Sequence, residues 1–142
     1  VSKALPQLEG KLTGNAIRVP TPDVSMAILN VKLTKPAGSA EELNELFRRE
    51  SIDGALRRQV GYSDSPEAVS TDFVGSRTAG VVDSLATVVT DDSAIVYVWY
   101  DNEFGYSCQV IRVIESMAGV HPQVVPARVA IDLNAVRALL DS

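Results

Sequence analysis

The chain has 142 residues, of which 46% are hydrophobic and 22% charged, and its formal net charge is −5. This composition is typical of one folded domain, and an acidic balance without a basic patch argues against nucleic acid or an anionic membrane as a partner. No apolar run approaches the roughly 20 residues that span a bilayer, and a single cysteine excludes an internal disulfide, which fits a cytoplasmic protein.

The chain begins at Val1 inside a short helical pattern over residues 1–8, so we expect it to be a piece of a longer protein. Residues 16–19 suit a short strand that ends at Pro20. Residues 24–33 alternate with the period of two that indicates a strand. The apolar residues that this alternation places on the buried face are Ala27, Leu29, Val31 and Leu33.

A helix is expected to begin after Ser39. Ser39 and Glu42 have the capping-box spacing, in which a hydroxyl accepts from an early helix amide and a carboxylate three residues later reaches back. Asp53 and Gly54 should end or bend this helix. Its apolar stripe consists of Leu43, Leu46, Phe47 and Ile52.

The second half of the chain is richer in strand patterns. Residues 80–90 and 94–100 have high strand propensity and are joined by a polar turn, which predicts an antiparallel hairpin. Residues 105–119 carry apolar side chains at helical spacing and stop at a glycine, a residue suited to a helix C-terminus. Weaker patterns predict strands over residues 56–62 and 69–74, and a last helix capped by Asp132 or Asn134.

Together these elements predict an α+β domain with a mostly antiparallel or mixed sheet and helices packed on one face. The sequence contains no Gly-x-Gly-x-x-Gly loop for dinucleotide phosphates. Asp91 and Asp92 are adjacent carboxylates in a turn, and no third ligand is evident, so we expect no metal site.

The run that begins at Trp99 is the most informative stretch. Residues 95–100 are all apolar and lead directly into Asp101, Asn102 and Glu103, after which the helical pattern begins. A buried strand that ends in polar side chains just before a helix is where open α/β sheets place groups that contact ligands. An asparagine that merely caps this turn is the alternative interpretation of Asn102.

Arg18 is a second candidate for ligand binding. It lies at the end of the short strand predicted over residues 16–19 and precedes the stiff turn Pro20-Thr21-Pro22. A guanidinium fixed beside a rigid turn suits an oxyanion or a phosphate. An ordinary ion pair at a strand end explains the same residue, and spacing alone leaves both interpretations open.

Several segments, in this order along the chain, resemble phosphorylating glyceraldehyde-3-phosphate dehydrogenases. They are residues 10–14, residues 17–22 with Val24 and Ser25, the run Ser70-Thr71-Asp72-Phe73 before Gly75, and residues 99–107. The resemblance covers residues 1–119, as the carboxyl-terminal part of the family's catalytic domain, and leaves residues 120–142 as a C-terminal extension. It implies a cytoplasmic homotetramer that converts glyceraldehyde 3-phosphate, NAD or NADP, and inorganic phosphate to 1,3-bisphosphoglycerate and the reduced cofactor.

The resemblance also implies roles for individual residues. Arg18 would hold the substrate phosphate and the attacking inorganic phosphate. Asn102 would fix the nicotinamide ring, because a carboxamide can both donate and accept, as the nicotinamide carboxamide does. Tyr106 would lie near the ring, and Glu103 would support the pocket.

The family's catalytic groups do not occur in these residues. Its nucleophile lies in a Ser-Cys-Thr-Thr-Asn-Cys segment and its base in a Thr-x-His-x-Tyr-Thr segment, and neither is present. We expect Cys108 to be a packed, inert thiol and His121 to be a surface residue. The 142-residue chain should therefore be inactive alone.

Two other functions remain open. The fold can serve as a structural module that self-associates through an exposed apolar sheet surface. Within the same enzyme class, an erythrose-4-phosphate dehydrogenase would share the phosphate and nicotinamide contacts.

Overall fold

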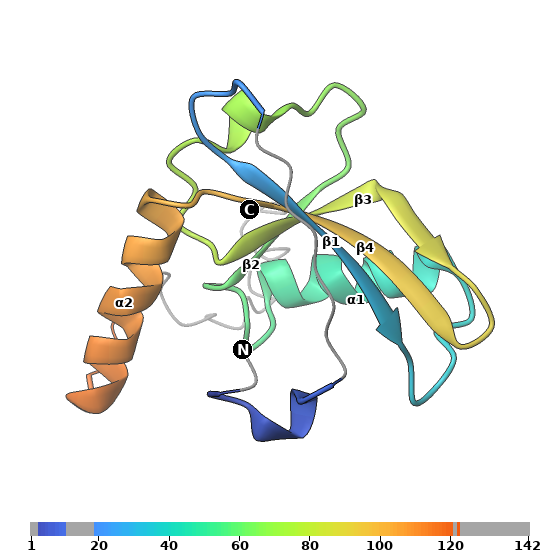
Figure 1. Ribbon diagram of the computed structural model, residues 1–142, viewed down its shortest axis with the longest axis horizontal. Helices are drawn as coiled ribbons and strands as arrows, with labels where there is room; N and C mark the ends of the chain where they lie inside the picture. Colours follow the sequence, from blue (N-terminus) through green and yellow to red (C-terminus); the bar gives the residue numbers. More distant parts are fainter. Residues whose placement is uncertain (1–2, 11–18, 121, 123–142) are drawn as a thin grey trace, which may run out of the picture.

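The computed structural model describes residues 3–10, 19–120 and 122 (Figure 1). No helix among these residues combines the length and the apolar character that crossing a bilayer requires. In chain order the elements are η1 (Pro6–Leu8), β1 (Ser25–Lys32), α1 (Ala40–Ile52), β2 (Val60–Ser63), η2 (Ser70–Phe73), β3 (Gly80–Val89), β4 (Ser93–Tyr100) and α2 (Phe104–Met117).

The four strands form one mixed sheet in the order β1-β4-β3-β2. β4 lies between β1 and β3 and is antiparallel to both, whereas β2 pairs with β3 in parallel. The β3–β4 pair is the predicted hairpin, and its register shifts between Asp83 and Val88. The α+β class expected from the sequence is confirmed.

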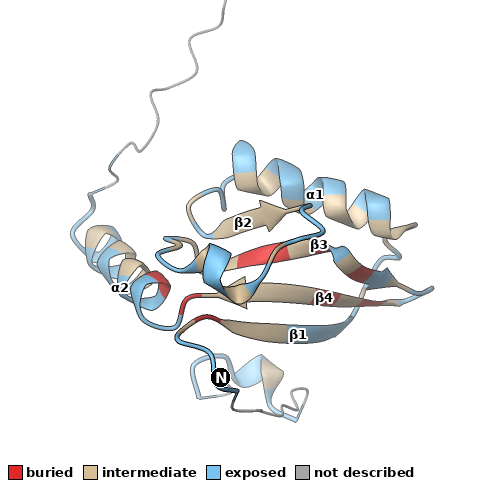
Figure 2. Cartoon of the chain, turned by 90° about the horizontal axis from the view of Figure 1, so that it is seen from above, coloured by how far each residue is buried: buried red, intermediate tan, exposed pale blue. Residues whose placement is uncertain are grey.

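The hydrophobic core lies between α1 and the middle of the sheet (Figure 2). Its buried centre consists of Val82 on β3 with Ala94 and Val96 on β4. Leu43 and Phe47 pack against this centre from α1. These two residues are four apart, so they lie on the same side of the helix, one turn from each other.

The ends of α1 agree with the sequence, whereas its apolar stripe is narrower than predicted. Ser39 Oγ accepts a hydrogen bond from the Glu42 main-chain N–H at 3.2 Å. The Ser39 N–H donates to the Ala37 carbonyl, so the Glu42 carboxylate does not complete the reciprocal half of the capping box. Leu46 and Ile52, predicted in the apolar stripe, are 51% and 55% exposed, because one narrow side of α1 faces the sheet.

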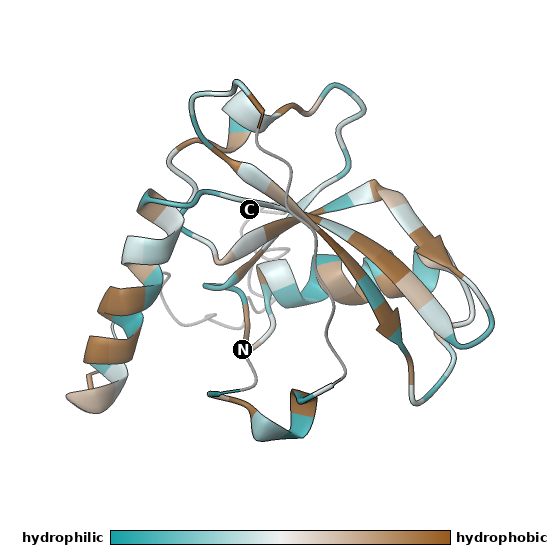
Figure 3. Cartoon of the chain, in the orientation of Figure 1, coloured by the Kyte–Doolittle hydropathy of each residue, from teal (hydrophilic) through white to brown (hydrophobic). Residues whose placement is uncertain are grey.

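The prediction that Leu29 and Val31 are buried is wrong. Both side chains are exposed, and so is Ile28 on the opposite face of the strand. β1 is an edge strand, while α1 packs over β2 and β3, so no described residue covers the outer half of β1. Figure 3 shows the hydrophobic residues that this arrangement leaves along β1.

The strand predicted over residues 69–74 is also wrong. This segment forms the single tight turn η2, in which the Val69 N–H donates to Asp72 Oδ2 at 2.9 Å. A side chain that bonds to the backbone three residues before it offers an alternative to strand pairing. The Asp72 bond therefore outweighs the high β-propensity of Val69 and Val74.

Three other predictions are shortened or lie outside the described residues. Of residues 56–62, only those from Val60 onward form a strand, because the Val60 N–H donates to the Leu56 carbonyl and closes a turn. Of residues 16–19, only Val19 is described, and it is not in a strand. The predicted last helix lies outside the described residues.

Candidate functional site

A cleft of about 400 Å³ lies where β4 meets α2, a volume within the range of small-molecule sites. Three parts of the chain form it: the end of β4, the segment 75–79 before β3, and the first two turns of α2. Its lining residues are Ala79, Tyr100, Asp101, Asn102, Gly105, Tyr106 and Gln109.

The position of the cleft follows from an antiparallel arrangement. Ser25 at the start of β1 pairs with Tyr100, and Val81 at the start of β3 pairs with Trp99. The carboxyl end of β4 therefore lies between the amino ends of its two neighbours. The rule that ligands bind at the carboxyl ends of strands in open α/β sheets predicts the segment that lines the cleft, although β4 is antiparallel to both of its neighbours.

The carboxylate of Asp101 organises this junction. Asp101 is 3% exposed. Its Oδ1 accepts from the main-chain N–H groups of Glu103 at 2.9 Å, Phe104 at 2.6 Å and Gly105 at 3.4 Å. Its Oδ2 accepts from the Gly75 N–H at 2.8 Å. One side chain thus caps the start of α2 and joins it to a segment 26 residues earlier.

Hydrogen bonds keep this carboxylate charged. The Gly75 N–H lowers the pKa of Asp101 most, burial opposes the change, and the helix amides of Phe104, Glu103 and Gly105 lower the pKa further. Each of these donors stabilises the ionised form. The negative charge also lies at the positive end of the α2 dipole, where an anion is favourable.

Gly105 allows the segment 75–79 to lie against α2. A Cβ at this position would meet the Thr78 carbonyl oxygen at 3.0 Å and the Ser76 carbonyl oxygen at 3.2 Å. Both distances are shorter than an ordinary van der Waals contact. The two walls of the cleft therefore approach this closely because residue 105 has no side chain.

A second group of hydrogen bonds joins the same two walls. Gln109 Nε2 donates to the Arg77 carbonyl at 3.2 Å and to the Gly105 carbonyl at 3.0 Å. Arg112 donates through Nη1 to Gln109 Oε1 at 2.7 Å and through Nη2 to the Arg77 carbonyl at 3.2 Å. The side chain of Gln109 is thus held in one orientation where it lines the cleft.

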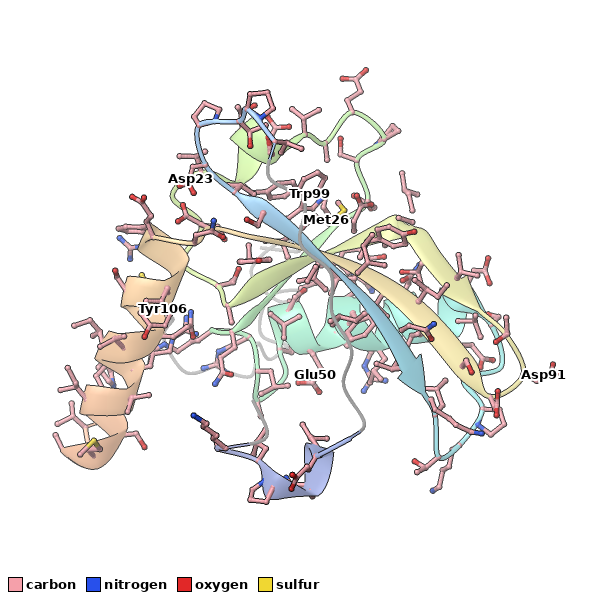
Figure 4. The ribbon with its side chains drawn as sticks, in the orientation of Figure 1. Asp23, Met26, Glu50, Asp91, Trp99 and Tyr106 are labelled. Atoms are coloured by element: carbon pink, nitrogen blue, oxygen red, sulfur yellow. The ribbon has the colours of Figure 1, made fainter. Side chains whose placement is uncertain are left out.

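Asn102 and Tyr106 present the accessible polar groups of the cleft. Tyr106 is 67% exposed on α2, and Figure 4 shows it at the same end of the molecule as Asp23. Within the described part of the chain, the Asn102 carboxamide makes no hydrogen bond to protein, and its lining position leaves it available to a ligand. With the rings of Tyr100 and Tyr106, the cleft offers aromatic surface beside an unpaired amide.

The segment that enters β1 has an unusual conformation. Val24 has φ = 68°, a left-handed value that is rare for a β-branched residue, and it is 6% exposed. The Val24 N–H donates to Asp23 Oδ1 at 2.6 Å, which supports the bend. Because Val24 directly precedes Ser25, the partner of Tyr100, this bend lies beside the cleft end of the sheet.

Comparison with known proteins decides the family. Residues 1–102 match the model of the glyceraldehyde 3-phosphate dehydrogenase C-terminal domain. The chain belongs to the glyceraldehyde-3-phosphate dehydrogenase family. The family match ends at Asn102 and so includes the buried Asp101, whereas the helical wall of the cleft lies beyond it.

Individual relatives agree with this assignment. A glyceraldehyde-3-phosphate dehydrogenase-like protein of Pseudomonas aeruginosa (strain UCBPP-PA14) is 62% identical over 125 residues, which cover 88% of this chain and 27% of that protein. The cytosolic glyceraldehyde-3-phosphate dehydrogenase of Ginkgo biloba is 47% identical over 119 residues, or 83% of this chain and 34% of that protein. The Echinococcus multilocularis enzyme is 42% identical over 118 residues, 82% and 34% of the two chains. The chain thus spans about a third of the length of these curated relatives.

The predicted site residues of this glyceraldehyde-3-phosphate dehydrogenase family member fall into three groups. Asn102 and Tyr106 lie together in the cleft. Glu103 is not among the lining residues; its N–H donates to Asp101, and its carbonyl accepts from Ser107 Oγ at 2.8 Å. Arg18 lies outside the described residues.

Sequence reasoning missed two residues that line the cleft, Asp101 and Gln109. Asp101 belongs to the polar run that was singled out, but it was given no role. An aspartate shortly before a predicted helix is a capping signal that could have identified it. Gln109 had no signal of its own, because its cleft position depends on the close approach of Arg77 from a distant segment.

Of the remaining candidate groups, Cys108, Asp91 and Asp92 lie among the described residues. Cys108 is a half-buried free thiol on α2, and its reactivity stays a prediction. Asp92 pairs with Lys32 at 3.1 Å in an exposed turn. No group of three or more His, Cys, Asp or Glu residues that could hold a metal occurs in the described part of the chain. His121 lies outside that part.

Proposed function

We propose that this chain forms part of the active site of a phosphorylating glyceraldehyde-3-phosphate dehydrogenase. The reaction oxidises glyceraldehyde 3-phosphate with NAD and inorganic phosphate and gives 1,3-bisphosphoglycerate and NADH. The observation that carries this proposal is the cleft between β4 and α2, which Asn102, Tyr100 and Tyr106 all line. Family membership supports the same reaction class.

The residues that line the cleft fit a nicotinamide ring. The Asn102 carboxamide makes no hydrogen bond to another described residue, and it can donate to and accept from the ring's own carboxamide. The aromatic faces of Tyr100 and Tyr106 suit a flat ring, and the cleft volume of about 400 Å³ is ample for it. When bound, NAD supplies a hydride acceptor; Asn102 orients the ring, and Glu103 supports the turn through its main-chain bond to Asp101. The chemistry of these residues does not distinguish NAD from NADP.

Arg18 is proposed to bind the phosphate of the aldehyde substrate and the attacking inorganic phosphate. Its guanidinium offers a planar fork of donors that matches phosphate oxygens. The Pro20-Thr21-Pro22 turn and the left-handed Val24 that follow it give this segment a stiff connection to β1. The thiol nucleophile and the histidine base of the reaction come from residues outside this chain.

Variants of the complete enzyme test both assignments. Asn102→Ala removes one or two hydrogen bonds to the ring, each worth about 1 kcal/mol, so the KM for NAD should rise on the order of tenfold. Ser107→Ala, an exposed change on the same helix, should leave it unchanged. Arg18→Ala should raise the KM values for the aldehyde and for inorganic phosphate. Unchanged KM values in both variants would refute the proposal.

The isolated 142-residue chain should show no phosphate-dependent production of NADH, because it lacks the family's nucleophile and base segments. Measurable activity from a preparation of this chain alone would contradict that expectation. Comparing glyceraldehyde 3-phosphate with erythrose 4-phosphate as substrates of the complete enzyme separates the two dehydrogenase activities that the cleft can serve.

A cytoplasmic homo-oligomer is the proposed state of the complete protein. The exposed apolar residues Ile28, Leu29 and Val31 on the edge strand β1 favour assembly through the sheet. The composition of the chain favours neither nucleic acid nor a membrane as a partner. Sedimentation of the chain with Leu29→Asp beside the unmodified chain tests the assembly, since the charge should dissociate a complex that uses this surface.

A further inference from the structure

We propose that Asp101 is a positioning residue for cofactor binding: by joining the turn that contains Asn102 to the segment 75–79, it holds Asn102 in its orientation. This inference rests on the proposed function of Asn102. It assigns a role in the affinity for NAD to a carboxylate that is 3% exposed and that accepts hydrogen bonds from main-chain N–H groups.

The argument begins with the turn that contains Asn102. Asp101 precedes Asn102, and Asp101 Oδ1 accepts from the N–H groups of the next two residues, Glu103 at 2.9 Å and Phe104 at 2.6 Å. The backbone of Asn102 therefore lies inside a turn in which the side chain of the preceding residue bonds to the two residues that follow. The direction in which the Asn102 carboxamide leaves the chain follows from that turn.

The second oxygen of the Asp101 carboxylate bonds to a residue outside this turn. Asp101 Oδ2 accepts from the Gly75 N–H at 2.8 Å, and Gly75 has φ = 81°, a conformation open to glycine. A helix cap needs only Oδ1, so capping leaves the bond to Gly75 unexplained. This bond ties the turn that contains Asn102 to the segment that ends in Ala79, another lining residue of the cleft.

The local structure can survive the loss of the Gly75 bond. Gln109 and Arg112 both donate to the Arg77 carbonyl and hold the same segment at a second point. Asparagine and serine cap helices about as well as aspartate does. Asp101→Asn and Asp101→Ser therefore keep the cap, whereas neither offers an acceptor to the Gly75 N–H, because the amide nitrogen donates and the serine side chain is too short.

The test is a double-mutant cycle in the complete enzyme. Asp101→Asn and Asp101→Ser should each raise the KM for NAD roughly tenfold and leave the KM for the aldehyde within twofold. In an Asn102→Ala background, either change should alter the KM for NAD less than twofold, because the residue through which Asp101 acts is gone. Asp83→Asn is the matched control: it alters a carboxylate on β3 that accepts from Trp99 Nε1 at 3.1 Å, and it should leave the KM for NAD unchanged.

Each outcome decides the proposal. A KM for NAD that stays within twofold in both Asp101 variants, even with a lowered Tm, reduces Asp101 to a helix cap and overturns the inference. Independent effects that multiply in the cycle overturn it as well, since Asp101 would not act through Asn102. If Asn102→Ala alone leaves the KM for NAD unchanged, the proposed function of the cleft fails, and the inference fails with it.

Discussion

Substitution of Gly105 by alanine changes the free energy of unfolding through two opposing effects, helix propensity and packing, and the sign of the change shows which is larger. In the first turn of α2, helix propensity alone favours alanine over glycine by about 1 kcal/mol. The structure opposes this gain, because the new Cβ would lie 3.0 Å from the Thr78 carbonyl oxygen and 3.2 Å from that of Ser76. Ordinary contact begins at 3.4 Å, so the Thr78 carbonyl has to retreat by about 0.4 Å.

The segment that must retreat is fixed at two points. Asp101 holds it at Gly75, and Gln109 and Arg112 hold it at Arg77. Overpacking of this kind costs about 1–3 kcal/mol. Subtracting the propensity gain leaves an expected loss in the free energy of unfolding of about 1 kcal/mol.

Urea denaturation of the chain, followed by the fluorescence of its single tryptophan, measures this loss. Ser107→Ala is the control, since it also ends in alanine on the same helix but removes only an exposed hydroxyl, which donates to the Glu103 carbonyl at 2.8 Å, and adds no atom to the packing. A Gly105→Ala chain that is more stable than the unmodified chain would refute the packing argument. That result would mean that the segment 75–79 moves aside freely.

Three further predictions concern contacts away from Gly105. Phe73→Leu should lower the stability by about 1 kcal/mol and change the Trp99 fluorescence, because the rings of Phe73 and Trp99 stack with their centroids 5.5 Å apart. An unchanged emission spectrum would contradict the contact. Glu115→Gln breaks the 3.0 Å ion pair with Arg58 that joins α2 to the turn after α1. Urea titration should find that the free energy of unfolding falls by up to about 1 kcal/mol and that this loss shrinks in 1 M salt. A loss that does not depend on salt would exclude an ionic cause. The pKa of Asp101 is lower in the folded chain than its ordinary value of 3.8, so its contribution to stability is present above that value and is lost as the pH falls through the folded pKa. The stability difference between the unmodified chain and Asp101→Asn should therefore shrink as the pH falls from about 5 to about 3. A difference that stays constant over this range would contradict the assignment.

The sequence predicts the elements whose signals are local. Ser39 identifies the start of α1, and the valine-rich residues of β3 and β4 with their polar turn identify the hairpin. The polar run after Tyr100 points to the cleft, and Asn102 and Tyr106 lie in it. In each case a few neighbouring residues contain the whole signal, since capping, turn formation and alternation are interactions between residues close in the chain.

Burial along β1 is not a local property, and the structure of residues 69–74 depends on one specific side-chain bond. The alternation of Leu29 and Val31 reports a strand, but whether that strand is covered depends on where α1 packs. The Asp72 side chain turns a segment of high β-propensity into η2. Pattern reasoning fails at both places because the deciding contact comes from a different element or from one specific side-chain bond.

The sequence by itself determined the family, the α+β class and the polar turn that carries Asn102, because motif order and local periodicity are written in consecutive residues. Only the tertiary structure decided that Asp101 joins two segments, that Gly105 permits their close approach, and that Gln109 lines the cleft. These three roles depend on a main-chain segment 26 residues away in the chain from Asp101, and no pattern in consecutive residues records that proximity.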